Sequence, residues 1–238
     1  MLILAVESSA KPVSVAVYQA PDGEPANNGK LLGQYFQNNG FSHSRTLMAM
    51  TESLLKNLEI DQSDIGLIAV SNGPGSFTGV RIGVSAVKGL AWGLGIPVCG
   101  VSTLEAMAYQ IPDHDGVLCA VMDARRDQVY NALFENRTGK LNRLCDDRAI
   151  SLEELAADLN KYNTRCLVVG DGTDVCINYP DLSGYPAVCE QLRFQTAYGV
   201  ALAAVNGKYI PPEELEPCYL RPSQAEREYS HSSSKSSS

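Results

Sequence analysis

The sequence predicts an α/β protein built from two similar halves, each of which opens with a β-hairpin. The first observation is a pair of short apolar runs, Leu2–Glu7 and Val13–Tyr18, separated by a five-residue turn. The second is a matching pair, Val117–Asp123 and Val129–Phe134, near the middle of the chain. The third is that segments with helical apolar spacing follow both pairs. Strands that alternate with helices in this way are typical of an α/β fold.

The two halves correspond at a fixed offset in the sequence. A shift of 116 positions places Glu7 on Asp123 and Val13 on Val129. Each half therefore has a strand that ends in an acid, a five-residue turn and a second strand, as expected of an internal duplication. This is the two-lobed layout of the actin-like, sugar-kinase and Hsp70-ATPase (ASKHA) superfamily. Those proteins bind ATP between the halves, on the two hairpin turns.

The remaining elements follow from apolar periodicity and capping residues. In the first half we expect a strand at Leu31–Gln37, a helix capped by Ser42 that runs to about Leu58, a strand at Ile65–Val70, a helix capped by Thr78 that runs to about Gly93, a strand at Pro97–Val101 and a short helix from Thr103. In the second half we expect a helix from a capping box at Ser151 and Glu154 to about Leu159, a strand at Arg165–Val169 and a helix over 195–206.

The predicted domains follow from these elements. Residues 1–110 form an N-terminal lobe and residues 111–205 form a second lobe. Residues 206–226 form a C-terminal segment that we expect to return to the first lobe. The last stretch, 227–238, is rich in Ser and of low complexity, which predicts disorder.

Composition limits the classes of function. At 238 residues, the chain can bury the core of one large domain or two small ones. Its formal charge of −8 argues against a protein that grips nucleic acid alone, because phosphate neutralisation needs clustered Lys and Arg. The seven scattered cysteines favour free thiols in a reducing cytosol over a zinc site. No apolar run is long enough to span a membrane, so we expect a cytoplasmic protein.

The glycine-rich segment Ser71–Gly83 stands where a phosphate-binding loop would stand, after a strand and before a helix. A Walker loop needs Lys after its last glycine, but Gly79 is followed by Val80. A Rossmann loop needs Gly-x-Gly-x-x-Gly, and here the third glycine comes one residue too late. We therefore expect the glycines to turn the chain and to let another element approach the helix closely. The stripe of small residues on this helix consists of Gly79, Gly83, Ala86 and Gly93.

Six segments carry a resemblance to a known family. They are ILAVESS at 3–9, SVAVY at 14–18, GPGSFTGVRIGVSAVKGLA at 73–91, GVSTLEAMA at 100–108, DARRDQVYNALF at 123–134 and EPCYLRP at 216–222. Over nearly all of residues 1–222 the chain resembles the bacterial TsaB family, also called YeaZ. The resemblance implies a non-catalytic dimerisation or assembly subunit in the synthesis of tRNA threonylcarbamoyladenosine (t6A). It implies that the chain binds the catalytic subunit TsaD, that the ATPase TsaE joins them, and that tRNA is reached only through this complex.

The resemblance also identifies positions where a catalytic metal would be held. TsaD-like proteins carry a His-x-x-x-His pair after the glycine helix, and Thr103 and Met107 occupy the matching positions here. Neither side chain is a suitable ligand for a divalent ion. The three histidines, His43, His114 and His231, contain no pair at this spacing. We therefore expect no metal site, no catalytic residue and no enzymatic activity in the chain itself.

The hairpin turns leave two alternatives for nucleotide binding. The turn after Asp123 has no glycine, although phosphate loops use glycine so that backbone N–H groups can approach. We favour the interpretation in which Glu7 and Asp123 only end their strands and bind turn amides. No cofactor is then required, and ATP or ADP would bind only at the junction with TsaD. The alternative function is an independent ATP-binding ATPase or kinase. The residues of this vestigial nucleotide site are Glu7, Ser9, Asp123, Arg125, Gly170 and Gly172.

The resemblance implies a partner surface on the helices over 42–58 and 78–94. The chain would pair with TsaD there, or with a second copy of itself when TsaD is absent. The alternative is that the apolar side of the first helix and the small stripe of the second belong to the core. The expected interface residues are His43, Leu47, Met50, Leu54, Arg81, Gly83, Ala86 and Val87.

Overall fold

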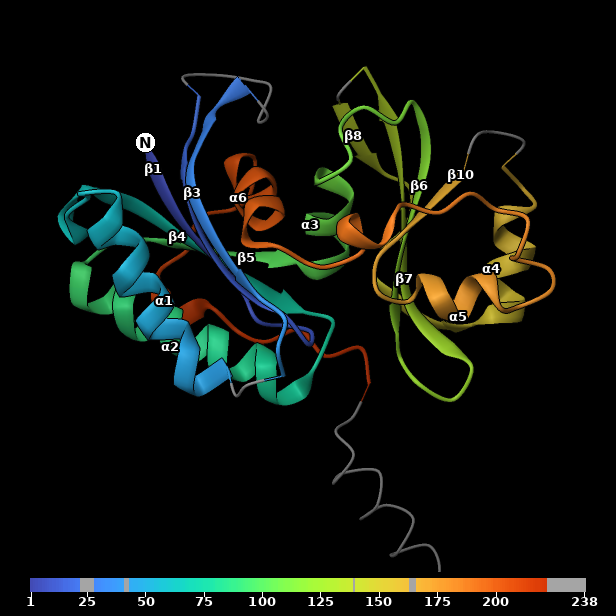
Figure 1. Cartoon of the computed structure of the whole chain (residues 1–238), viewed down its shortest axis with the longest axis horizontal. Coiled ribbons are helices and arrows are strands. Elements are labelled where there is room, and N and C mark those ends of the chain that lie inside the picture. The colour runs from blue at the N-terminus through green and yellow to red at the C-terminus, as the bar shows by residue number, and fades with distance from the viewer. Residues whose placement is uncertain (22–27, 41–42, 139, 163–165, 222–238) are drawn as a thin grey trace, which may run out of the picture.

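The computed structural model describes residues 1–21, 28–40, 43–138, 140–162 and 166–221. The chain forms two α/β lobes side by side, each built on a five-stranded sheet (Figure 1). The first sheet, in the order β3-β2-β1-β4-β5, consists of β1 (Leu2–Glu7), β2 (Val13–Gln19), β3 (Lys30–Gln37), β4 (Ile65–Gly73) and β5 (Val98–Ser102). The second, in the order β10-β6-β7-β8 with β9 paired to β7, consists of β6 (Gly116–Asp123), β7 (Gln128–Arg137), β8 (Lys140–Arg143), β9 (Arg148–Ser151) and β10 (Cys166–Val169). The predicted fold class is confirmed.

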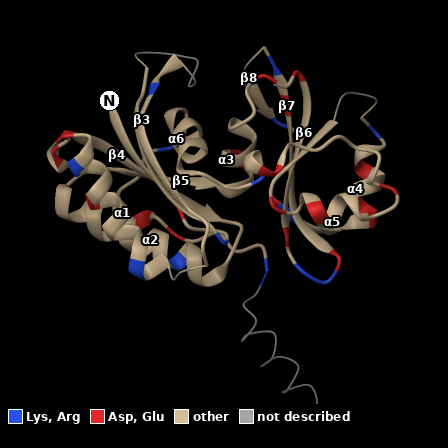
Figure 2. Cartoon of the chain, viewed as in Figure 1, with Lys and Arg blue, Asp and Glu red and all other residues tan. Residues whose placement is uncertain are grey.

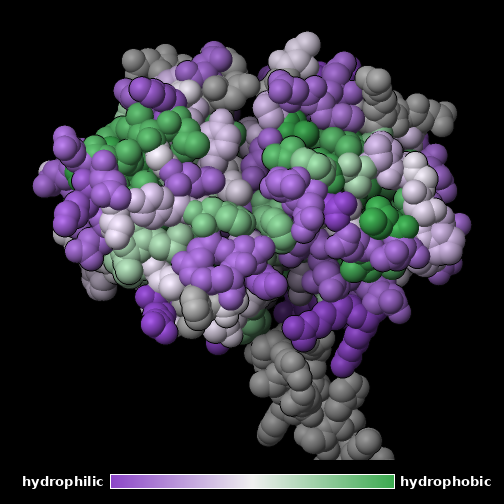
Figure 3. Space-filling model, in the orientation of Figure 1, coloured by the Kyte–Doolittle hydropathy of each residue, from purple (hydrophilic) through white to green (hydrophobic). Residues whose placement is uncertain are grey.

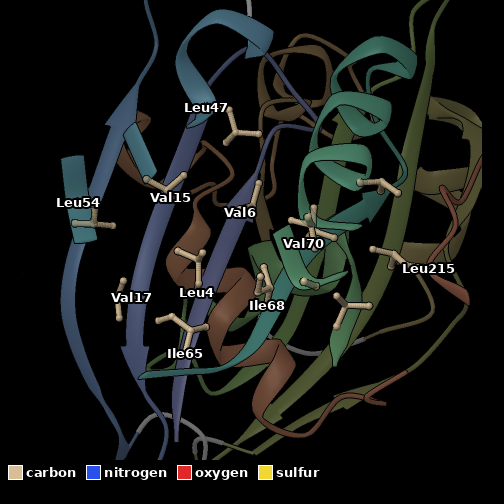
Figure 4. Close-up of a cluster of buried hydrophobic side chains, with 14 of the residues drawn as sticks. Leu4, Val6, Val15, Val17, Leu47, Leu54, Ile65, Ile68, Val70 and Leu215 are labelled. Atoms are coloured by element: carbon tan, nitrogen blue, oxygen red, sulfur yellow. The ribbon is translucent and has the colours of Figure 1, made fainter. Parts of the chain in front are cut away.

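Two helices cover the outer face of the first sheet. They are α1 (His43–Asn57) and α2 (Phe77–Leu94), and they lie next to each other. Alternation along the strands sends every second apolar side chain to this face. Figure 4 shows that Leu47 and Leu54 of α1 point into the resulting core. The strands contribute Leu4, Val6, Val15, Val17, Ile68 and Val70 to it.

The helices between the two sheets are exchanged between the lobes. Helix α3 (Thr103–Tyr109) follows the first sheet in sequence but packs on β6 and β7, whereas α6 (Ala197–Val205) follows the second sheet and packs on the first (Figure 1). The two helices lie so close together that a Cβ atom at Gly199 would overlap the carbonyl oxygen of Ala106. The sequence predicts residues 197–205 as part of the second lobe, whereas helix α6 packs on the first sheet. The domain boundaries stay a prediction.

The two hairpins are related, with a difference in register. In the first hairpin Ala5 pairs with Ala16, and in the second Ala120 pairs with Ala132. Ala5 and Ala120 both face the helices between the sheets. The first strands therefore correspond with an offset one residue smaller than that of the second strands, because the second hairpin has one residue more between its paired alanines.

This register corrects the predicted equivalence of the two acids. Glu7 pairs with Ser14, whereas Asp123 pairs with Val129. Asp123 therefore occupies the position that Ser8 occupies in the first lobe. Because side chains alternate along a strand, a one-residue difference moves a side chain to the other face of the sheet.

The second lobe contains elements that were not predicted. Strands β8 and β9 and helix α5 (Thr173–Ile177) have four or five residues each, too short to show a periodic pattern. Helix α4 (Leu152–Leu159) begins at the predicted capping box of Ser151 and Glu154. All seven cysteines are free thiols, as expected. None of the helices in the described residues combines the length and the apolar character that a membrane span needs. The predicted cap Ser42, Arg165 and the tail after residue 221 lie outside the described residues.

The glycine-rich segment packs against the first hairpin turn. Ser76, not the predicted Thr78, caps α2, and its side chain accepts the N–H of Gly79. A Cβ atom at Gly79 would overlap the Ser8 carbonyl oxygen, and one at Gly83 the Ser8 hydroxyl. The Ser8 hydroxyl donates to the Gly79 carbonyl at 2.9 Å. The glycines thus bring two backbone segments into contact. This agrees with the prediction that they let another element approach the helix closely.

The C-terminal segment lies along the first lobe and ends on the second. Ile210 forms a β-bridge with Val98, and Leu215 is buried in the core of the first lobe (Figure 4). A Cβ atom at Gly73 would overlap the Cys218 carbonyl oxygen, so this glycine makes room for the segment. Arg221 Nη1 then donates to a carbonyl of the second hairpin turn at 2.8 Å.

Gly79→Ala tests the close contact between α2 and the first turn. The added methyl group must displace backbone, so we expect a loss of about 1–3 kcal/mol in the free energy of unfolding. Gly89→Ala is the matched control, because Gly89 lies in the same helix with open space around its Cβ position. This control should gain up to about 1 kcal/mol from helix propensity. Urea denaturation measures both, and equal effects of the two substitutions would contradict the contact.

Candidate functional site

Glu7 lies at the end of β1 and is completely buried. Its Oε1 accepts hydrogen bonds from the backbone N–H and the hydroxyl of Ser9, both at 2.6 Å. Its Oε2 accepts a hydrogen bond from the Ser71 hydroxyl of β4. Burial raises the pKa of the Glu7 carboxyl, while the hydrogen bonds from Ser71 and Ser9 act in the opposite direction. Glu7 therefore joins β1, the first turn and β4, in agreement with the favoured interpretation that it binds turn amides.

The polar groups of Ser8 and Ser9 in the first hairpin turn are buried and take part in hydrogen bonds within the chain. Ser8 and Ser9 have no exposed surface. The N–H of Ser9 is used by Glu7, and the Ser9 carbonyl accepts the N–H of Ser76 at 2.6 Å. A phosphate loop needs backbone N–H groups that a ligand can reach. The packing of the glycine-rich segment covers the groups that would serve this purpose.

The second hairpin turn is exposed and has an unusual backbone. Arg125, Arg126 and Asp127 have positive φ angles of 63°, 59° and 55°. A left-handed conformation costs a residue with a Cβ atom about 1 kcal/mol or more. Asp123 supports the turn, because its Oδ1 accepts the N–H of Arg125 at 2.7 Å. Like Glu7, Asp123 thus binds a turn amide, but it is exposed whereas Glu7 is buried.

Asp171 is the acidic residue of this region that the sequence did not single out. It lies between Gly170 and Gly172, and its carboxylate interacts electrostatically with Asp123 and Glu7. A Cβ atom at Gly170 would overlap the Val121 carbonyl oxygen, so this glycine is required by the close approach of β6. Asp171 Oδ1 accepts a hydrogen bond from Gln195 Nε2 at 3.1 Å. The structure thus brings acids from both lobes together at the lobe junction.

Burial raises the pKa of Asp171 to about 6. The amide of Gln195 is fully buried, and its Oε1 has no hydrogen-bond partner. Within the described residues, no group of three or more His, Cys, Asp or Glu is arranged to hold a metal ion. Burial therefore makes Asp171 easier to protonate than an exposed aspartate.

Thr103 and Met107 lie in the core between the lobes. Both are on α3, with exposed fractions of 0% and 1%. Met107 belongs to the hydrophobic cluster under the second sheet, and its sulfur would lie 3.1 Å from a Cβ atom at Gly170. Apolar packing therefore fills the space at Met107, one of the two positions that match the metal pair of TsaD-like proteins.

Half of the expected interface residues are buried within the chain. Leu47, Leu54 and Val87 belong to the core of the first lobe, and Gly83 faces Ser8. Their side chains do not reach the surface, because the apolar side of each helix covers the sheet. The core alternative therefore describes these four positions correctly.

The other four expected interface residues reach the surface in part. Met50 and Ala86 are partly buried, and His43 Nε2 forms a hydrogen bond with the Pro12 carbonyl at 3.1 Å. Arg81 is exposed, and its Nε donates to the Tyr219 hydroxyl at 2.9 Å. Whether these residues contact a partner stays a prediction.

Two further apolar side chains on the same helices are exposed, and Trp92 among them is not predicted from the sequence. Trp92 of α2 is 80% exposed and Met48 of α1 is 46% exposed. Large apolar residues with this exposure are common at protein interfaces. Trp92 could have been recognised from the sequence, because it is the single Trp of the chain and lies within the small-residue helix.

Asp171→Asn tests the environment of the acids at the junction. The pKa of Asp171 is about 6 in the folded chain against an ordinary 3.8, so the charged form destabilises the fold above pH 6 and has no effect below pH 3.8. We expect Asp171→Asn to raise the free energy of unfolding at pH 7.5 by up to about 3 kcal/mol, and to have no effect near pH 3.5. Asp181→Asn, at an exposed position in the same lobe, is the control. Urea denaturation at both pH values measures the difference, and a destabilised Asp171→Asn at pH 7.5 would contradict the assignment.

Comparison with known proteins identifies the family. The family model of TsaD, described as tRNA N6-adenosine threonylcarbamoyltransferase, matches residues 39–198. The tRNA threonylcarbamoyladenosine biosynthesis protein TsaB of Bacillus subtilis (strain 168) is 33% identical over 175 residues, covering 74% of this chain and 73% of that protein. The TsaB protein of Escherichia coli (strain K12) is 29% identical over 231 residues, covering 93% and 95%. The structure of YeaZ from Pseudomonas aeruginosa matches with a TM-score of 0.76 and 26% identity, over 92% of this chain and 99% of that chain. The chain therefore belongs to the TsaB (YeaZ) family.

Proposed function

We propose that this chain is a non-catalytic assembly subunit in the synthesis of threonylcarbamoyladenosine in tRNA. The observation that carries the proposal is the chemistry of Thr103 and Met107, which stand at the metal-ligand positions of TsaD-like proteins. Both are buried, and Met107 lies in apolar packing. A chain with the TsaD-related fold and without metal-binding side chains at these positions is suited to hold another subunit. We propose a TsaD-type transferase as the direct partner and a TsaE-type ATPase as a further component.

The outer sides of α1 and α2 are the proposed docking surface, called here the α1–α2 surface. Its members Arg45, Met48, Arg81, Ser85 and Trp92 are exposed. Burying a side chain of the size of Trp or Met removes a large apolar area from water, which favours association. In the absence of a partner, we propose that two copies pair through the same surface.

The proposed role needs no nucleotide in the chain itself. The buried first turn and the glycine-free second turn support this part of the proposal, because neither offers the accessible, flexible backbone of a phosphate loop. ATP or ADP would bind only at the junction with the TsaD-type subunit. An independent ATPase or kinase would instead need these turns to open.

Reconstitution of the modification reaction tests the proposed function. The purified chain is combined with TsaD-type and TsaE-type subunits, the substrates of the pathway and unmodified tRNA. We expect synthesis with the complete set, none with the chain alone, and a strong loss when the chain is omitted. Transfer by the chain alone, or full synthesis without it, would overturn the proposal.

Trp92→Ala tests the α1–α2 surface. Removal of an exposed anchor should weaken binding to the TsaD-type subunit about tenfold or more, which corresponds to about 1.4 kcal/mol. The fold should be unaffected, since Trp92 is 80% exposed. Leu192→Ala is the control, because Leu192 is an exposed apolar residue of the second lobe at 45%. Calorimetric titration measures the affinities, and a Trp92→Ala chain that binds as tightly as the Leu192→Ala chain would rule out this surface.

A further inference from the structure

The tip of the hairpin between β6 and β7 presents two adjacent arginines to solvent. Arg125 and Arg126 are both exposed. The interactions of the described residues include no hydrogen bond or ion pair of either guanidinium group. Figure 2 shows this turn in blue at the end of the second lobe, and Figure 3 shows a hydrophilic projection at the same place. On a chain with a formal charge of −8, two adjacent exposed arginines are a distinct feature.

The backbone of this turn is held from three directions. The Arg125 N–H donates to Asp123, and the Ala124 N–H donates to the Gln128 carbonyl at 3.0 Å. From outside the hairpin, the Leu152 N–H donates to the Asp127 carbonyl at 3.3 Å. Arg221 of the C-terminal segment donates to the Ala124 carbonyl at 2.8 Å. The turn is thus fixed by its own strand, by the start of α4 and by the C-terminal segment, and none of these bonds uses the side chains of Arg125 or Arg126.

The conformation is unfavourable for the residues that adopt it. Three consecutive residues with a Cβ atom, 125–127, have positive φ angles, a conformation in which Gly or Asn is more easily accommodated. Such conformations persist where surrounding structure enforces them, and they concentrate at functional sites. The packing around the turn explains how the backbone is held. It does not explain why arginines, whose side chains contribute nothing to that packing, occupy the positions.

Two exposed guanidinium groups side by side are suited to phosphate oxygens, which they can bind with paired hydrogen bonds. A nucleotide is a poor fit, because the turn has no glycine and its backbone N–H groups at Ala124 and Arg125 are already used. An extended phosphodiester backbone needs only exposed cations at a protruding edge. We propose that the Arg125–Arg126 turn contacts the phosphodiester backbone of tRNA when the chain is part of its assembly. The proposal rests on the proposed function, and to the expectation that tRNA is reached only through the complex it adds a direct contact made by this chain.

The double substitution R125N/R126N tests this contact. Asn tolerates the left-handed conformation, so the turn should keep its shape while it loses both charges. In the reconstituted assembly with an unmodified tRNA transcript, we expect the KM for tRNA to rise several-fold with kcat retained. The slope of log affinity against log salt should decrease in magnitude by about 1 to 2. Asp127→Asn should act in the opposite direction and lower the KM, because it removes an exposed acid beside the arginines.

The matched control is R137N/K140N, which removes two exposed positive charges at the opposite end of β7. It should leave the KM for tRNA unchanged. A wild-type KM and salt slope in R125N/R126N would overturn the proposal, as would an equal effect of the control. Loss of binding to the TsaD-type subunit in R125N/R126N would also overturn it, since the turn would then contact protein. If wild-type chain fails to support synthesis, the proposed function fails first and this proposal falls with it.

Discussion

The contact between the first hairpin turn and helix α2 determines how the rest of the first lobe is arranged. Gly79 and Gly83 allow the backbone of Ser8 to lie against the helix, where a larger residue would overlap it. The same contact seals Glu7 inside the lobe, and Glu7 in turn joins β1 to β4 through Ser71. A glycine-rich segment that stands at the position of a phosphate loop therefore serves internal packing.

The consequence is an asymmetry between two related halves. The first turn is buried and its polar groups bind each other, whereas the second turn is exposed and carries Arg125 and Arg126. The exchanged helices α3 and α6 join the lobes, and packing around Met107 takes up space between them. In a family related to a tRNA-modifying transferase, this arrangement fits a chain that keeps the two-lobed shape for assembly without needing a reactive centre. In the proposed role, the acids at the junction affect the stability of the fold.

The sequence predicts the long elements of this fold well, because alternation and helical spacing over six or more residues reflect burial directly. The sequence does not predict the details that a single residue determines, such as the cap of a helix or the register of a hairpin. Ser76 caps α2 in place of Thr78, and one residue more in the second hairpin moves Asp123 out of register with Glu7. The junction acid Asp171 was missed because its environment is created by Gln195, which is distant in sequence. Apolar helix positions such as Leu47 could be assigned to core or to interface only once the sheet beneath them was known.

In the proposed function, the first turn serves packing and binds no nucleotide. Calorimetric titration of the purified chain with ATP and Mg²⁺ tests it most directly, because binding there would have to displace Ser8 and Ser9 from α2. We expect no saturable heat up to millimolar ATP. Stoichiometric binding at micromolar affinity, abolished by a bulky substitution at Ser9, would contradict it.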